Sequence, residues 1–215
     1  VHVLRVWDMY SKINYAVTKG AEPMIGEAAA FAEKAHRGVF RKGTDIPYIT
    51  HPLETAVIVS AFTDDEEMIA AALLHDVMED AGVTKGELEE AFGARVACLV
   101  MDESEDKRKT WQERKGYTVR HLSTASRDIK ILALGDKLSN MRSTARDYLV
   151  VGDAIWQRFN EKDKKKHAWY YWGIARALKE LEEHVYYQEY IMLCRNVFGP
   201  DMCLSGEEIP HNYNS

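Results

Sequence analysis

The sequence predicts an all-α protein built as a single compact helical domain. Apolar residues recur with helical spacing along most of the chain, and the apolar–polar alternation of strands is nearly absent. Glycine, proline and capping residues divide the chain into helix-length segments. The 215 residues, 46% apolar and 29% charged, fit one soluble globular domain. We expect this domain at residues 22–198, between an N-terminal extension (1–21) and a C-terminal tail (199–215).

The first half of the chain predicts four helices. A loop rich in glycine and charged residues follows the first of them, and the third is apolar on nearly every side, which indicates burial. Thr84 and Glu87 form a capping box at the start of the fourth, and Gly93 ends it. The expected helices are Glu22–Gly38, His51–Phe62, Glu66–Asp80 and Lys85–Phe92.

The second half begins with a charge cluster, Asp102–Lys109, which we interpret as a loop. Two further helices and a final pair complete the expected set. These four are Trp111–Ala125, Ser126–Tyr148, Asp163–Glu183 and Val185–Phe198.

Composition excludes several classes of function. No stretch approaches the roughly 20 apolar residues of a membrane helix, and the first residues lack a secretory signal pattern. The net charge of −6 argues against broad nucleic-acid binding. Three scattered cysteines form no CxxC pair, which excludes a cysteine zinc site. We expect a cytoplasmic protein with a small-molecule partner, no nucleic acid and no membrane; a homo-oligomer stays open.

The chemically informative segment is the third expected helix, which carries His75, Asp76, Glu79 and Asp80 in its apolar stretch. Burying these groups costs several kcal/mol unless each finds a partner. In one helix, residues four apart lie on adjacent turns, so all four would line one sector. A divalent cation would supply the missing charge. The alternative is a buried, hydrogen-bonded His75–Asp76 pair without metal.

Two more candidate ligands come from other helices. His51 opens the second helix, and Asp136 lies in the apolar run Ile131–Leu138. Two imidazoles and two carboxylates favour six-coordinate manganese, iron or a similar ion over a closed zinc site. Glu79 and Asp80, one turn beyond, could move protons or could only orient His75.

These motifs resemble the HD-domain phosphohydrolases, and within them the hydrolase domain of the RelA/SpoT family and the stand-alone small alarmone hydrolases. The resemblance spans about residues 25–181 and leads us to expect a stand-alone hydrolase. The matching blocks are His36 with Arg41-Lys42-Gly43, Pro47–Pro52, Ala72–Asp80, Phe92-Gly93 and Gly135–Arg142.

The resemblance implies a reaction and a set of site residues. His51, His75, Asp76 and Asp136 would hold one divalent ion, Mn²⁺, while Glu79 and Asp80 would act in catalysis. Metal-activated water would remove the 3′-pyrophosphate of (p)ppGpp, returning GDP or GTP. The implied substrate contacts are Arg41 and Lys42 near the base, Asn140 at the sugar, and Lys166, Tyr170, Arg114 and Lys115 near the phosphates.

At several of these positions a purely structural role is the alternative to the functional one. Asn140 could simply bond Asp136 on its own helix face, and the lysines of residues 162–166 could be a solvated helix start. Trp169–Trp172 read as core aromatics. For the whole protein, the alternatives are another HD phosphohydrolase (an NADPH 2′-phosphatase or a nucleotidase) and a non-catalytic, metal-dependent alarmone-binding protein.

Overall fold

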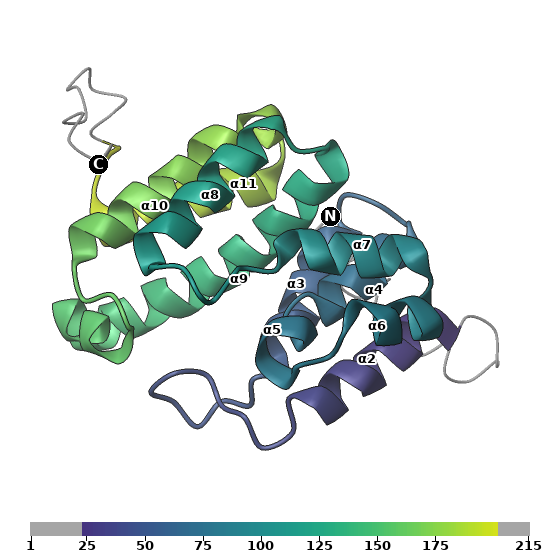
Figure 1. Cartoon of the computed structure of the whole chain (residues 1–215). Coiled ribbons are helices and arrows are strands. Elements are labelled where there is room, and N and C mark those ends of the chain that lie inside the picture. Colours follow the sequence, from purple (N-terminus) through teal and green to yellow (C-terminus); the bar gives the residue numbers. More distant parts are fainter. Residues whose placement is uncertain (1–22, 202–215) are drawn as a thin grey trace.

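The structure, a computed structural model, describes residues 23–201. In this range the regular elements are all helices, and one isolated antiparallel bridge joins Phe40 and Pro47. The longest helix, α9, runs through the middle of the molecule, with α2–α7 on one side and α8, α10 and α11 on the other (Figure 1). The predicted all-α class is confirmed. The helices are α2 (Pro23–Ala35), α3 (Thr50–Ser60), α4 (Glu66–Leu74), α5 (Val77–Ala81), α6 (Lys85–Phe92), α7 (Ala94–Glu103), α8 (Trp111–Thr124), α9 (Arg127–Val151), α10 (Lys164–Ala177) and α11 (Val185–Phe198), with 3₁₀ segments η1 (Gly152–Arg158) and η2 (Lys179–Leu181).

Two helices form the centre of the core. All seven residues from Met68 to Leu74 of α4 are buried, as α4 packs against α2, α3, α7 and α9. Helix α9 packs against both α3 and α11, which explains why its apolar residues are not confined to one stripe. The sequence-based expectation of a buried central helix is confirmed for this segment.

Side-chain caps are present at three helix starts. The Asp65 carboxylate accepts hydrogen bonds from the amides of Glu67 and Met68 at the start of α4. The capping box of Thr84 and Glu87 opens α6 with reciprocal hydrogen bonds, and the Ser126 hydroxyl caps α9. These local signals place the helix starts within one residue of the predicted positions.

The predicted continuous helix from Glu66 to Asp80 is wrong. Helix α4 ends at Leu74, and α5 starts at Val77. The cause lies in His75, whose Nδ1 lies 2.8 Å from the carbonyl oxygen of Ala72. In a continuous helix that carbonyl would accept from the amide of Asp76. The segment that carries the four predicted polar residues is therefore divided between the α4–α5 break (His75 and Asp76) and helix α5 (Glu79 and Asp80).

Two further expectations about the helices differ from the structure. Helix α7 was not predicted, and its last two residues belong to the expected loop at residues 102–109. The expected helix Asp163–Glu183 ends at Ala177 and is followed by η2. The expected extension, residues 1–21, and all but the first three residues of the expected tail lie outside the described residues.

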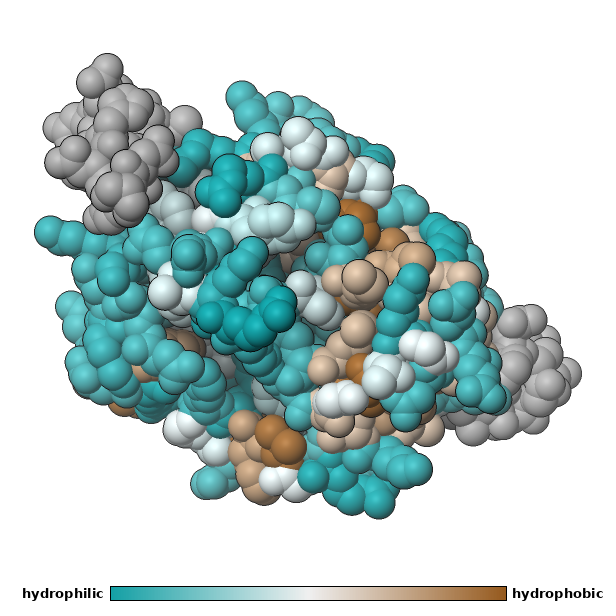
Figure 2. All heavy atoms as spheres, in the orientation of Figure 1, coloured by the Kyte–Doolittle hydropathy of each residue, from teal (hydrophilic) through white to brown (hydrophobic). Residues whose placement is uncertain are grey.

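The face seen in Figure 2 is largely hydrophilic, with an apolar area on the side where α6 and α7 lie. In this part of the chain Met101 is 52% exposed, and Cys98 is exposed as well. Among the described residues, none of the helices has the length and hydropathy needed to span a bilayer.

Gly135 allows the close approach of α3 and α9. A Cβ there would lie 3.0 Å from Val59 Cγ2 and 3.2 Å from the carbonyl oxygen of Thr55. We expect Gly135→Ala to lower the free energy of unfolding by about 1–3 kcal/mol, because backbone cannot yield as a side chain can. Gly86→Ala, on α6 with open space around it, is the control and should raise stability by up to about 1 kcal/mol. Chemical denaturation of both variants measures this, and equal stabilities would contradict the packing argument.

Candidate metal centre

Side chains from three parts of the chain meet where α3, the α4–α5 break and α9 join. His51 Nε2 lies 3.1 Å from His75 Nε2, 3.4 Å from Asp76 Oδ2 and 3.2 Å from Asp136 Oδ1. His75 Nε2 lies 3.1 Å from Asp76 Oδ2 and 3.9 Å from Asp136 Oδ1. Ligand atoms of His51, His75 and Asp136 all lie within 4.8 Å of one another. The structure thus brings together all four residues that the sequence nominated as ligands.

The donor set of this cluster fits a cation. The Nδ1 atom of His75 faces a backbone carbonyl and therefore carries a proton, so Nε2 is the nitrogen that can bind a cation once the imidazole is neutral. The Nδ1 atom of His51 is likewise engaged outside the cluster, 2.8 Å from the Ser139 hydroxyl. The Nε2 atoms of two imidazoles and the oxygens of two carboxylates therefore face one another, and both imidazoles are buried. Imidazole nitrogen with carboxylate oxygen is a donor set used for divalent transition ions.

Electrostatics of the cluster are dominated by its carboxylates. Burial by itself lowers the pKa of His75, but the charges of Asp76 and Asp136 outweigh it and raise that pKa to about 10. Burial would raise the pKa of Asp136, yet the Lys137 ammonium and the charge of His75 hold it well below its usual range. The cluster therefore holds a positive charge strongly, whether a proton or a metal ion.

Groups around the cluster orient its carboxylates. The Tyr48 hydroxyl donates to Asp76 Oδ2 at 2.7 Å. Lys137 donates to Asp136 Oδ2, and the Asn140 amide donates to Asp136 Oδ1 at 2.5 Å. Such outer partners fix the direction in which a ligand presents its lone pairs.

Glu79 and Asp80 face the segment that joins α7 to α8. Glu79 Oε1 accepts from the amide of Glu105 at 2.6 Å, and Lys107 Nζ lies 3.6 Å from Glu79 and 3.5 Å from Asp80. Burial raises the pKa of Glu79, and the charges of Asp76 and Glu105 add to the effect. Glu79 is thus half-buried and within electrostatic range of Asp76, with a pKa moved toward neutrality, which suits a proton-transfer group.

The loop between α2 and α3 connects to the cluster through Asn140. Arg41 NH2 donates to Asn140 Oδ1 at 3.2 Å, while the other end of that amide holds Asp136. The side chain of Asn140 therefore bonds Asp136 on its own helix, as the structural interpretation expects, and it also contacts Arg41. Lys42 is exposed on the same loop. Arg158 lies against Gly43, where a Cβ would meet its Cδ at 2.7 Å.

The remaining predicted contacts form two groups. Lys115 Nζ lies 4.9 Å from the centre of the Tyr170 ring and 2.8 Å from Glu105 Oε1, and Arg114 NH1 lies 3.2 Å from Glu105 Oε2. The Tyr170 hydroxyl is buried without a hydrogen-bond partner among the described residues. Lys166, by contrast, pairs with Glu161 at 2.8 Å near the start of α10.

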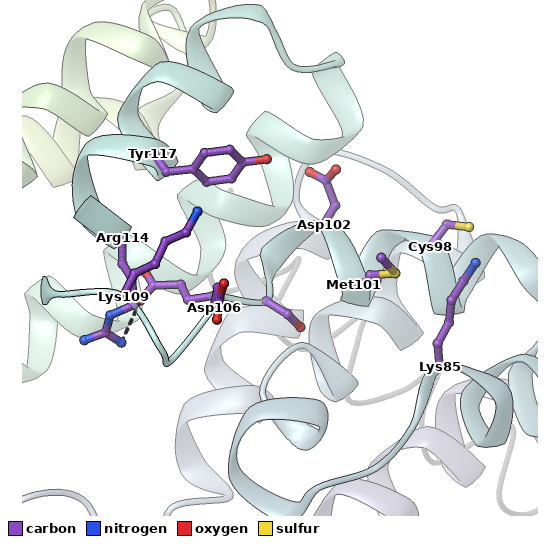
Figure 3. A pocket seen from close by; sticks show the side chains of 10 residues that line it. Lys85, Cys98, Met101, Asp102, Asp106, Lys109, Arg114 and Tyr117 are labelled. Carbon is purple, nitrogen blue, oxygen red and sulfur yellow. Dashed lines mark hydrogen bonds and ion pairs between the residues drawn. The ribbon is translucent and has the colours of Figure 1, made fainter. Parts of the chain in front are cut away.

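A cavity of about 570 Å³ lies between α7 and α8, with Arg114, Lys109 and Tyr117 on one side and Met101, Cys98 and Lys85 on the other (Figure 3). Three cations and three carboxylates line it, so it carries no net preference for an anion. Its lining includes Glu105, whose backbone holds Glu79. The lining residues are Lys85, Cys98, Met101, Asp102, Ser104, Glu105, Asp106, Lys109, Arg114 and Tyr117.

Sequence reasoning missed several groups at this centre. Lys137 stands beside Asp136 in the same apolar run, so the burial argument that nominated Asp136 could also have found it. Glu103, assigned to the expected loop, ends α7, and burial raises its pKa to about 7, with Asp136 and Asp102 adding to the shift. Tyr48 and Ser139 lie inside the matching blocks, but a lone hydroxyl has no spacing pattern that marks it as a site residue.

Comparison with known proteins places this centre in a family. A family model described as HD domain matches residues 28–162, which include all four cluster residues. The chain belongs to the HD-domain family. An HD-domain hydrolase implies a divalent metal, and His51, His75 and Asp136 could hold one.

Relatives of this HD-domain chain include named hydrolases. It is 41% identical over 123 residues to guanosine-3′,5′-bis(diphosphate) 3′-pyrophosphohydrolase MESH1 of Danio rerio, covering 56% of this chain and 68% of that protein. The Homo sapiens MESH1 is also 41% identical over 123 residues, covering 56% and 69%. A Haemophilus influenzae 3′-pyrophosphohydrolase is 43% identical over 118 residues, which cover 52% of this chain and 17% of the relative.

Two solved structures share the fold. Listeria monocytogenes EGD-e lmo0812 aligns with a TM-score of 0.65 and 31% identity, covering 70% of this chain and 99% of that one. A metazoan orthologue of SpoT, described as hydrolysing ppGpp, aligns with a TM-score of 0.70 and 24% identity, covering 83% and 98%. The second likeness supports the HD fold alone.

Metal uptake by this cluster should release protons. Because the pKa of His75 is raised to about 10 in the metal-free protein, its imidazole is protonated at neutral pH and must lose that proton to bind a cation. We expect about one proton released per divalent ion bound near pH 7, and an affinity that falls about tenfold per pH unit on acidification. Calorimetry in buffers of different ionisation enthalpy counts the protons. Uptake without proton release would contradict the charge balance described above.

Proposed function

We propose that this chain removes the 3′-pyrophosphate of (p)ppGpp, giving GDP or GTP and pyrophosphate. The observation that carries the proposal is the meeting of His51, His75, Asp76 and Asp136 in one buried cluster. Relatives 41% identical are named 3′-pyrophosphohydrolases, and the HD family model contains all four residues.

In this proposal the four cluster residues hold one Mn²⁺. Mixed nitrogen and oxygen ligands suit a six-coordinate ion better than tetrahedral zinc. The ion lowers the pKa of a bound water and neutralises charge on phosphoryl oxygens. Tyr48 supports the arrangement by holding one oxygen of Asp76, and Lys137 and Asn140 support it by holding Asp136.

Glu79 is the proposed proton acceptor for the attacking water, with Asp80 assisting it. Its raised pKa and its position beside Asp76 support this role. The Glu105 amide occupies Oε1 of Glu79, which leaves Oε2 for the water and its proton. Lys107, 3.6 Å from that oxygen, then favours the carboxylate form, so Glu79 is ready to accept a proton.

The nucleotide is proposed to lie between the Arg41 loop and the α8–α10 side. Arg41 and Lys42 face the base, and Asn140 contacts the sugar. Tyr170 offers a buried hydroxyl, and Lys166 offers an ammonium that exchanges Glu161 for phosphate. Arg114 and Lys115 would likewise exchange Glu105 for the distal pyrophosphate.

A substrate panel tests the reaction. With Mn²⁺, the purified chain should release pyrophosphate from ppGpp and leave NADPH and dNTPs intact at the same enzyme concentration. His75→Ala and Asp136→Ala should lose Mn²⁺ binding and at least about 100-fold in rate, because each removes a proposed ligand. If phosphate is released from NADPH while ppGpp stays intact, the proposed substrate is wrong. Full turnover in His75→Ala or Asp136→Ala would refute the proposed ligand set.

Glu79→Gln separates proton transfer from metal binding. We expect the variant to bind Mn²⁺ within a few-fold of the parent while kcat falls about 100-fold or more, because an amide cannot accept the proton. Glu90→Gln, an exposed position on α6, is the matched control and should keep the parent's kcat. An unchanged kcat in Glu79→Gln would leave this residue only a structural part.

A further inference from the structure

A continuous series of hydrogen bonds runs from the metal centre to the last helix. His51 Nδ1 lies 2.8 Å from Ser139 Oγ, which lies 2.7 Å from Glu54 Oε2. Arg142 NH1 donates to Glu54 Oε1 at 3.0 Å. Arg142 Nε and NH2 donate to the two carboxylate oxygens of Glu189 on α11, at 2.6 and 2.7 Å. We call these five residues the His51 relay.

The direction of each hydrogen in the relay follows from donor counting. The Glu54 carboxylate, which is paired with Arg142, can only accept hydrogen bonds. Ser139 must therefore donate its one hydroxyl hydrogen to Glu54. The Ser139 oxygen can then only accept from the imidazole, and Nδ1 of His51 must carry the proton. Nε2 of His51 consequently presents a lone pair to His75 and Asp136.

We propose that Ser139 and Glu54 are positioning residues that hold His51 in the tautomer able to bind the cation, with Arg142 fixing the orientation of Glu54. This inference rests on the proposed metal-dependent function. Ser139 is 1% exposed and His51 is 2% exposed, so bulk water has little access to either group. The opposite tautomer would place a hydrogen on Nε2, 3.1 Å from His75 Nε2, where it would block ligation by His51.

Glu54→Gln is the most direct test, because it reverses the direction of the hydrogen bonds in the relay while the side chain keeps its size and shape. Arg142 requires an acceptor, so the new side chain must turn its carbonyl to Arg142 and its NH₂ to Ser139. Ser139 then accepts from the amide and donates to Nδ1 of His51, which moves the imidazole proton to Nε2. The substitution should therefore harm metal binding more than removing the hydroxyl does.

We expect Ser139→Ala to weaken Mn²⁺ affinity about tenfold and Glu54→Gln about 100-fold, measured by competition with a chelating dye. The variant with both Ser139→Ala and Glu54→Gln should bind Mn²⁺ with the affinity of Ser139→Ala alone. Without the Ser139 hydroxyl, the new amide at position 54 has no hydrogen-bonded route to His51. Two-bond ¹H–¹⁵N correlation spectra of the metal-free proteins should show His51 protonated on Nδ1 in the parent and on Nε2 in Glu54→Gln. Additive losses in the double variant, or the same tautomer in both proteins, overturn the proposal.

Control variants separate the relay from general damage. Glu180 lies on η2 and pairs with Lys130 of α9, outside the relay, so Glu180→Gln should leave Mn²⁺ affinity unchanged. If Glu54→Gln does not fold, Ser139→Thr, which keeps the hydroxyl, should bind more tightly than Ser139→Ala, and equal affinities overturn the proposal. A parent that binds Mn²⁺ but spares (p)ppGpp refutes the proposed reaction only, whereas a parent that binds no Mn²⁺ refutes both.

Discussion

The need for a positive charge among the facing side chains at the junction of α3, the α4–α5 break and α9 is the constraint on which this structure depends. Two imidazole nitrogens face carboxylate oxygens at 3.1–3.9 Å in a buried site. Such a cluster is stable only with a positive charge between its members. The packing of α3 and α9, close enough that Gly135 has no room for a Cβ, keeps those members together.

Most side chains of this cluster make a hydrogen bond to a group outside it. Tyr48 holds Asp76, Lys137 and Asn140 hold the two oxygens of Asp136, and the Ala72 carbonyl holds His75. Asn140 extends these contacts to the Arg41 loop, and Glu105 joins Glu79 to the cations of α8. Hydrogen bonds therefore connect Arg41 with the proposed ligand Asp136, and Arg114 and Lys115 with the proposed proton acceptor Glu79, so a change in one group is felt by the other.

Most of the fold was accessible from the sequence, because helix starts and apolar periodicity are local properties. Asp65, Thr84 and Ser126 marked three helix starts, and the apolar run of Met68–Leu74 marked the buried helix. The break at His75 was not accessible, since it depends on an imidazole taking the Ala72 carbonyl from the helix. Helical spacing therefore predicted one helix where the structure has two.

By itself, the sequence determined the all-α class and the four residues that meet in the centre, because an ionisable group in an apolar run needs a partner wherever the chain folds. Tertiary structure decided which atoms those partners offer. Ser139 and Glu54 lie 85 residues apart in the sequence, and they meet only because α3 and α9 pack together. That contact directs the Ser139 hydrogen to Glu54, and His51 can then present the lone pair of Nε2 to the metal centre. Hydrogen-bond direction depends on three-dimensional neighbours, and no residue pattern along the chain encodes it.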